Sequence, residues 1–214
     1  LSIENPGLYS LVGSNGCGKS TIFKLLERFY ECKVGKIEIN QVPINKYSAS
    51  DLRNNIVYMP KKPFFLQGTI MDNLKLGQNE ISDLEVIEVC KKVGIHSDIQ
   101  KLEKGYYELI ESGGENFSSG QKQKLGFVRV LLKKADIVLL DEVTSDLDGE
   151  AERQICNQIE EIAKKAIVLN IAHKPESIRR SKKVFFIQGG KIVAEGTHKA
   201  LMKNCVDYKK IFAN

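Results

Sequence analysis

The sequence predicts an α/β domain in which a mostly parallel sheet forms the core and a helical segment interrupts it. Short apolar runs of strand length alternate with longer amphipathic stretches in the first and last thirds of the chain. Between about residues 69 and 134 the pattern changes to helices and connecting loops. We therefore expect a core formed by residues 1–68 and 135–214, with a mainly helical subdomain of residues 69–134 inserted into it.

The individual elements follow from apolar runs and from apolar residues at helical spacing. The expected strands are Tyr9–Val12, Lys36–Ile39, Ile56–Met59, Ile137–Leu140, Ile167–Ile171, Val184–Ile187 and Lys191–Glu195. The expected helical faces are Ile22, Leu25, Leu26 and Phe29, then Leu84, Ile87 and Val93, then Leu125, Val128, Leu131 and Leu132. Strands that are continuously apolar are typical of a parallel sheet covered on both faces.

Composition excludes several classes of protein. The 214 residues are 42% hydrophobic and 28% charged, which is ordinary for a soluble domain. The net charge of +5 comes from dispersed Lys and Arg, so we expect no nucleic-acid partner. Five widely spaced cysteines without a CxxC pair indicate reduced cytosolic thiols rather than a zinc site or redox dithiol. No apolar run approaches the roughly 20 residues of a membrane span.

The first residues resemble the interior of a domain rather than a natural N-terminus. Leu1–Glu4 resembles the end of a strand and is followed by the turn Asn5-Pro6-Gly7, with no initiating Met. We expect the chain to be an excised piece of a longer protein.

A phosphate-binding loop follows the first predicted strand. The residues Gly13-Ser-Asn-Gly-Cys-Gly-Lys19-Ser20-Thr21 match G-x-x-x-x-G-K-[ST] between a strand and a helix, which is the context that the motif requires. Glycines let backbone N–H groups surround phosphate oxygens, and the helix directs its positive end at the anion. Lys19 is expected to bind the β- and γ-phosphates and Ser20 to bind Mg²⁺. The expected nucleotide-binding residues here are Ser14, Asn15, Gly16, Cys17, Gly18, Lys19, Ser20 and Thr21.

Two carboxylates end a second buried strand. Asp141 and Glu142 come directly after Ile137–Leu140, and the carboxyl ends of parallel strands face the ligand crevice of such sheets. We expect Asp141 to contribute to the Mg²⁺ site and Glu142 to polarise the attacking water as general base. Alone, the pair could equally be an acidic strand end that caps the next turn.

A third motif points to a family. Phe117-Ser118-Ser119-Gly120-Gln121 resembles the signature of the ATP-binding-cassette (ABC) family, and the stretch from Glu111 to Leu125 is similar to that of its exporters. The resemblance continues through Asp141–Asp148, the D-loop, to His173, the switch histidine, and to Gly190–His198. Independently, Ser118 and Gln121 have the S-x-x-Q spacing of a helix capping box.

The resemblance implies a RecA-like P-loop NTPase core that hydrolyses ATP with Mg²⁺. It also implies a head-to-tail dimer with a second nucleotide-binding domain, either a homodimer or a pseudo-symmetric heterodimer. Lys19, Ser20, Asp141 and Glu142 would act within one copy, while Ser118, Ser119, Gly120 and Gln121 would bind the nucleotide of the other. His173 would contact the γ-phosphate, and Asp148 would couple the two sites.

The same resemblance implies a membrane partner. The stretch from Tyr58 to Leu74 resembles the loop that joins the core to the helical subdomain in exporters, where an apolar part of this loop receives the transmembrane domain. Here that part corresponds to Phe64, Phe65 and Leu66, which we expect to be exposed. The domain would then work at the cytoplasmic face of a membrane as the motor of an exporter. Two alternatives stay open: a degenerate cassette that binds ATP for regulation, and an ABC ATPase without a transport role.

The sequence departs from the family pattern at four places. Lys61, or Lys62 in a shifted register, stands where the family has a Gln that touches Mg²⁺, and an ammonium cannot accept a metal bond. Ser119 replaces a signature glycine. Only twelve residues precede Gly13, so we expect the upstream aromatic residue that stacks on adenine to be missing. Cys17 lies beside Lys19 and a helix N-terminus, so we expect it to be alkylated readily and protected by ATP.

Overall fold

The computed structural model describes residues 1–78 and 80–212, and these form two compact units. The first unit contains the described residues among 1–58, 135–142 and 163–212, and the second those among 59–134 and 143–162. The second unit therefore includes two segments, 59–68 and 143–162, that the sequence analysis assigned to the core. Local packing explains this, because Pro63 lies against Gly126 and Gln154 lies against Gly94 within the second unit.

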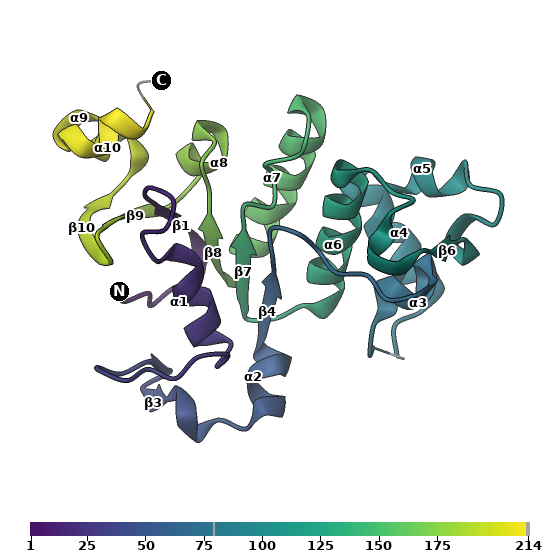
Figure 1. Cartoon of the computed structure of the whole chain (residues 1–214), viewed down its shortest axis with the longest axis horizontal. Helices are drawn as coiled ribbons and strands as arrows, with labels where there is room; N and C mark the ends of the chain where they lie inside the picture. The colour runs from purple at the N-terminus through teal and green to yellow at the C-terminus, as the bar shows by residue number, and fades with distance from the viewer. Residues whose placement is uncertain (79, 213–214) are drawn as a thin grey trace. The chain divides into compact units, whose positions relative to one another are not determined.

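A six-stranded sheet in the order β10-β9-β1-β8-β7-β4 organises the first unit (Figure 1). Strand β1 pairs in parallel with both β8 and β9, β7 pairs in parallel with β8, and β10 is an antiparallel strand beside β9. The strands are β1 (Gly7–Val12), β4 (Ile56–Met59), β7 (Ile137–Asp141), β8 (Ile167–Ile171), β9 (Lys183–Gln188) and β10 (Lys191–Gly196).

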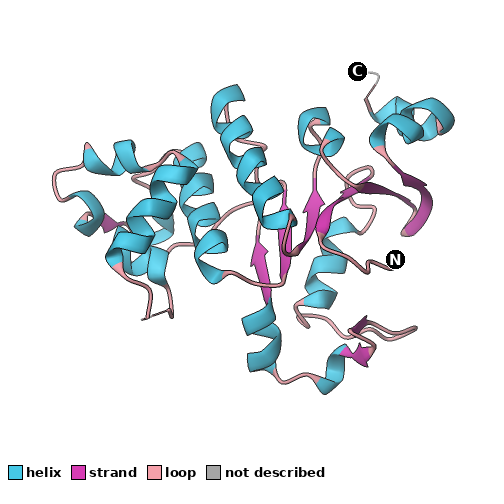
Figure 2. Ribbon diagram, turned by 180° about the vertical axis from the view of Figure 1, so that it is seen from behind, coloured by secondary structure: helices cyan, strands magenta, loops and turns pink. Residues whose placement is uncertain are grey.

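Both faces of the four strands β9, β1, β8 and β7 are buried, which explains their continuous apolar runs, whereas the edge strand β10 is largely exposed. In β9, Phe185 and Ile187 join the cluster on one face, while Val184 and Phe186 join the cluster on the other. The first face is covered by α1 (Lys19–Leu26) and α2 (Ala49–Asn55), through Phe23 and Leu52. The second is covered by α8 (Pro175–Arg179), α9 (His198–Asn204) and α10 (Val206–Ile211), through Ile178, Leu201 and Tyr208. Figure 2 shows the sheet strands from the reverse side.

Two hairpins and a 3₁₀ turn complete the first unit. Gly189 and Gly190 both have positive φ, 54° and 75°, as a two-residue hairpin turn between β9 and β10 requires. A small hairpin is formed by β2 (Glu38–Ile39) and β3 (Val42–Pro43), followed by a 3₁₀ turn at Ile44–Lys46. The helix after the phosphate loop ends at Leu26, so Phe29 is not on its buried face as expected but is 65% exposed.

The second unit is mainly helical. Its elements are β5 (Gly68–Thr69), α3 (Ile70–Lys75), α4 (Asp83–Val93), α5 (His96–Gln100), a 3₁₀ turn at Gly105–Tyr107, β6 (Leu109–Ile110), a 3₁₀ turn at Ser112–Gly114, α6 (Ser119–Lys133) and most of α7 (Gly149–Ala163). Helix α4 lies where expected and buries Val86, Cys90 and Val93. Of the residues expected on its face Val93 is buried, whereas Leu84 is 75% exposed. No helix in the described part of the chain is long and apolar enough to cross a bilayer.

Candidate functional site

The phosphate loop joins β1 to α1 and is stabilised from inside by its lysine. Strand β1 ends at Val12 and α1 begins at Lys19, so residues 13–18 form the loop. Lys19 is buried, and its Nζ donates to the carbonyl oxygens of Gly13 at 2.7 Å and Ser14 at 2.9 Å. The ammonium is therefore fixed beneath the loop at the helix N-terminus, where its charge adds to that of the helix dipole.

Glycines determine the shape of this loop. Gly16 and Gly18 have φ of 77° and 101°, and a Cβ atom on either would meet no atom within 4 Å. The space above these two residues is open, as a backbone cradle for phosphate oxygens needs to be. Gly13 is required because of close packing instead: a Cβ there would lie 2.2 Å from the Ile187 carbonyl oxygen and 2.7 Å from Cys17 Sγ.

Strand register brings the carboxylates to the same edge of the sheet as the loop. Ile171 of β8 pairs with Leu11 of β1 on one side and with Asp141 of β7 on the other. The loop follows β1 and Glu142 follows β7, so both continue beyond the carboxyl ends of neighbouring parallel strands. Ligands bind at this edge in open α/β sheets.

A tyrosine that the sequence analysis did not single out contacts Asp141. Tyr58 Oη, from β4, donates to Asp141 Oδ2 at 3.4 Å, and the Tyr58 ring packs edge-on against Phe23 of α1 at 5.9 Å between ring centroids. Burial, and then the Asp141 charge, raise the pKa of Tyr58 to about 12. The hydroxyl therefore keeps its proton at neutral pH and remains a donor. In the sequence, Tyr58 is indistinguishable from any other apolar residue of a strand.

Glu142 and His173 form a pair on strained backbone. His173 Nε2 lies 3.0 Å from Glu142 Oε1, with side chains 38% and 18% exposed respectively. Glu142 has φ of 53°, a left-handed conformation that is costly for a residue with a Cβ. Its N–H donates to the Ile171 carbonyl oxygen at 3.0 Å, which fixes this conformation at the end of the sheet. Strained backbone of this kind concentrates at active sites.

The oxygen donors at this edge suit Mg²⁺. The Ser20 hydroxyl and the Asp141 carboxylate are hard ligands, and Mg²⁺ is usually held by one or two such groups together with substrate phosphates. Among residues 1–78 and 80–212 there is no cluster of three or more His, Cys, Asp or Glu side chains that would hold a metal by protein ligands alone. The residues present therefore fit a metal that arrives with a nucleotide.

The signature motif begins helix α6 in the second unit. Gln121 N–H donates to Ser118 Oγ at 3.2 Å, and Ser118 N–H donates to Gln121 Oε1 at 3.0 Å, which confirms the expected capping box. Ser118 and Ser119 are exposed. The N-terminus of this 15-residue helix is therefore accessible to a ligand.

The proposed docking segment differs from the expectation at one residue. Phe64 and Leu66 are 66% and 49% exposed, but Phe65 is buried at 1%. The Arg129 guanidinium of α6 covers the Phe65 ring at 4.5 Å from its centroid. Expecting all three apolar residues to be exposed was therefore wrong for Phe65, because it anchors the loop to the second unit.

Arg129 and Asn73 also bind the backbone of that segment. Arg129 Nη1 donates to the Phe64 carbonyl oxygen at 2.5 Å, and Arg129 Nη2 donates to Asn73 Oδ1 at 2.9 Å. Asn73 in turn accepts from Leu66 N–H and donates to the Leu66 carbonyl oxygen, both at 2.9 Å. Burial lowers the pKa of Arg129 to about 10, so the guanidinium remains charged at neutral pH.

Three residues from the sequence analysis have other local contacts. The Lys61 side chain is exposed, while its carbonyl oxygen accepts from Gln123 Nε2 at 2.5 Å. Asp148 Oδ1 accepts from the Ala151 N–H at 2.9 Å and so caps α7. Cys17 is only 8% exposed, with Lys19 Nζ 3.8 Å from its sulfur. Its alkylation stays a prediction, and this burial would slow the reaction.

The comparisons with known proteins agree with this geometry. The family model described as ABC transporter matches residues 1–145. The chain therefore belongs to the ABC transporter family. An ABC multidrug transporter, MDR2, of Trichophyton rubrum is 39% identical over 214 residues, which is 98% of this chain and 16% of that protein. The leptomycin B resistance protein pmd1 of Schizosaccharomyces pombe is 38% identical over 204 residues, 95% of this chain and 15% of that protein.

A solved structure shares the fold. The structure of a bacterial Atm1-family ABC exporter with ATP bound has a TM-score of 0.93 and 30% sequence identity, and it covers 97% of this chain and 36% of that one. The chain thus spans about a sixth of the two fungal relatives and about a third of this exporter.

Proposed function

We propose that this chain is the ATP-hydrolysing motor domain of an ABC exporter. The observation that carries the proposal is the convergence, at one edge of one sheet, of a glycine-rich phosphate loop, a buried carboxylate and a strained Glu142–His173 pair. A general base, a phosphate cradle and a metal ligand are the parts that phosphoryl transfer to water requires. The family membership and the exporter-like relatives support the same reading.

Each residue has a defined task in this proposal. Lys19 and the loop amides bind the phosphate oxygens and offset the charge that develops during transfer. Glu142 accepts the proton of the attacking water, and His173, at 3.0 Å, fixes the orientation of that carboxylate. Ser20 and Asp141 would hold Mg²⁺, which supplies charge neutralisation between the phosphates when it is bound.

The signature helix is proposed to act on a second copy. Its exposed N-terminus at Ser118 and Ser119 offers a hydroxyl and unpaired helix amides to an anion. A nucleotide held on the phosphate loop of one copy would be covered by this helix of another copy, so that ATP joins the two and hydrolysis releases them. The proposed binding residues of the second copy are Ser118, Ser119, Gly120 and Gln121.

The membrane partner is proposed to dock on Phe64 and Leu66. These side chains are exposed while the backbone that carries them is held by Arg129 and Asn73. An apolar surface on a rigid support suits a partner helix, because little conformational entropy is lost on binding. The network ends on α6, the helix that begins with the signature. Movement of the docked segment would therefore be transmitted to Ser118.

Steady-state phosphate release with MgATP tests the motor proposal. Release should rise faster than linearly with chain concentration, because two copies complete each site. The Glu142→Gln variant should lose at least about 100-fold in rate, the contribution of a general base, while it accumulates an ATP-bound dimer in sedimentation velocity. ATP binding without turnover above the Glu142→Gln level at any concentration would contradict catalysis and favour a regulatory nucleotide site.

A substitution at Lys61 tests whether the departure from the family's Gln at this position slows hydrolysis. A Lys61→Gln variant restores the oxygen acceptor that the family has at this position, so we expect a higher turnover number with little change in nucleotide affinity. Lys62→Gln is the matched control for the alternative register. If neither variant changes turnover, the lysine at this position does not limit hydrolysis.

A further inference from the structure

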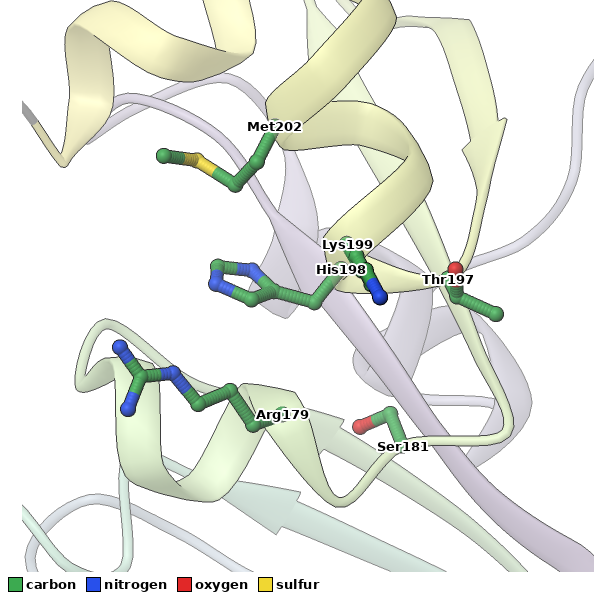
Figure 3. A pocket seen from close by; sticks show the side chains of 6 residues that line it. All are labelled: Arg179, Ser181, Thr197, His198, Lys199 and Met202. Atoms are coloured by element: carbon green, nitrogen blue, oxygen red, sulfur yellow. The ribbon is translucent and has the colours of Figure 1, made fainter.

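A hollow on the first unit shares no lining residue with the phosphate loop or with the other residues of the proposed hydrolytic site. It has a volume of about 500 Å³ and is bounded by the end of α8, the turn that follows α8, and α9 with its N-cap residue (Figure 3). The lining residues are Arg179, Ser181, Thr197, His198, Lys199 and Met202.

The charges around this hollow are all of one sign. Three of its six lining residues, Arg179, His198 and Lys199, are basic, and none is acidic. Within the described parts of the chain, neither Arg179 nor Lys199 has an ion pair, whereas the adjacent Arg180 is bound to Glu176 at 3.0 Å. Converging cations without a counter-ion repel one another, and an anion between them would relieve that repulsion.

His198 is fixed in place by its other nitrogen. His198 Nδ1 is hydrogen-bonded to Tyr208 Oη at 2.9 Å, and the imidazole packs edge-on against the rings of Tyr208 and Phe212. Tyr208 is completely buried, so the imidazole has a rigid support. Nε2 is the nitrogen left for a ligand, and Figure 3 shows Arg179 and His198 extending into the same space from separate elements.

The remaining walls limit what the hollow can bind. The Ser181 hydroxyl is buried and hydrogen-bonded to Ser10 Oγ at 2.7 Å, and Thr197 Oγ1 accepts from the Ala200 N–H at 3.2 Å. Met202 provides an apolar side. The donors come from the basic residues, so the ligand must supply acceptors. A phosphate group carries about two negative charges at neutral pH and three acceptor oxygens, which matches two permanent cations and one imidazole.

We propose that this hollow binds a phosphate group, with Arg179 and Lys199 pairing with its oxygens and His198 Nε2 donating a hydrogen bond. The bound group is either inorganic phosphate or the phosphate of a small monoester. This site is separate from the phosphate loop and does not depend on the proposed hydrolysis.

Nuclear magnetic resonance of the three histidines tests the proposal, because each reports a different place: His198 the hollow, His173 the hydrolytic site and His96 the second unit. The chain is labelled on histidine and titrated with potassium phosphate against potassium chloride of equal ionic strength. We expect a saturable shift of the His198 imidazole signals and an increased protonated fraction of His198, since a bound anion stabilises the charged imidazole. His96 should not shift.

Variants make the assignment specific. Arg179→Gln combined with Lys199→Gln should weaken phosphate binding at His198 at least about tenfold, as expected for loss of charge-assisted hydrogen bonds. Lys203→Gln removes an exposed cation from the same helix outside the lining and should leave the binding curve unchanged. Glycerol 3-phosphate titrated in parallel distinguishes the sources: tighter binding than inorganic phosphate identifies a monoester, and equal binding identifies the phosphate group alone.

Two results would overturn the proposal. One is a His198 signal that moves with phosphate no further than with chloride. The other is a saturable His198 shift that persists with the same midpoint in the double variant. Arg179 and Lys199 are exposed, and folding of the double variant is checked, before phosphate is added, by unchanged signals of His173 in the first unit and of His96 in the second. Lys199→Gln alone gives a second, milder test.

Discussion

The strained backbone of Glu142 allows its catalytic and structural contributions to be separated. Its φ of 53° lies in the left-handed region, which costs about 1–2 kcal/mol for a residue with a Cβ. Glycine has no such cost there, but it adds about 0.4–1 kcal/mol of conformational entropy to the unfolded chain relative to alanine. Glu142→Gly and Glu142→Ala lose the same side-chain contacts, including the one to His173. The difference between them isolates the backbone contribution.

We expect Glu142→Gly to be more stable than Glu142→Ala by about 0.5–1 kcal/mol, the difference between these two opposing effects. Urea unfolding followed by circular dichroism measures this directly, with the slope of the transition checked for equality between variants. In thermal unfolding the difference corresponds to about 1–4 °C for a chain of this size. Both variants should release no phosphate above background, since both lack the general base.

A helix position supplies the matched control. Glu88 is an exposed residue inside α4, where Glu88→Ala should be more stable than Glu88→Gly by about 1 kcal/mol, the ordinary helical order. The order should therefore reverse between the two positions. An alanine variant that is the more stable one at Glu142 as well would refute the reasoning, because the native φ at that residue would then not be left-handed.

Three further predictions follow from the same site. Tyr58→Phe removes the 3.4 Å hydrogen bond to Asp141 and should weaken metal binding in the presence of nucleotide by about 0.5 kcal/mol, roughly twofold, while binding of Mg²⁺-free nucleotide stays unchanged. Paramagnetic resonance of Mn²⁺ with ADP measures the metal affinity, and an equal affinity in the variant and the original chain would contradict the prediction. Gly13→Ala forces a Cβ to 2.2 Å from the Ile187 carbonyl oxygen and should destabilise the chain by about 1–3 kcal/mol in urea; a change within error would exclude the close packing. Cys17, at 8% exposed, should react with a thiol reagent far more slowly than the exposed Cys32, and ATP should slow it further; equal labelling with and without ATP would place Cys17 outside the nucleotide site.

The parts of the site that the sequence predicted are those with a local cause. A glycine-rich loop between a strand and a helix can be identified from nine consecutive residues, and the Ser118–Gln121 capping box from four. The strands expected to end at Leu140 and Ile171 could also be identified, to within one residue, because a buried parallel strand is a continuous apolar run. By contrast, Leu84 is exposed on α4 although Val93 is buried as expected, since a short amphipathic segment permits more than one apolar stripe.

The sequence by itself determined the family, the segments that form the strands and the position of the phosphate loop, because each of these depends on residues that are close together in the chain. Only the tertiary structure decided that Tyr58 contacts Asp141 across 83 positions, that Arg129 covers Phe65 and that Arg179 meets His198 at one hollow. These contacts join elements that are far apart in the chain, and a single sequence does not indicate which distant residues meet. The left-handed backbone of Glu142 belongs with them, since only the surrounding sheet holds a non-glycine residue in that conformation.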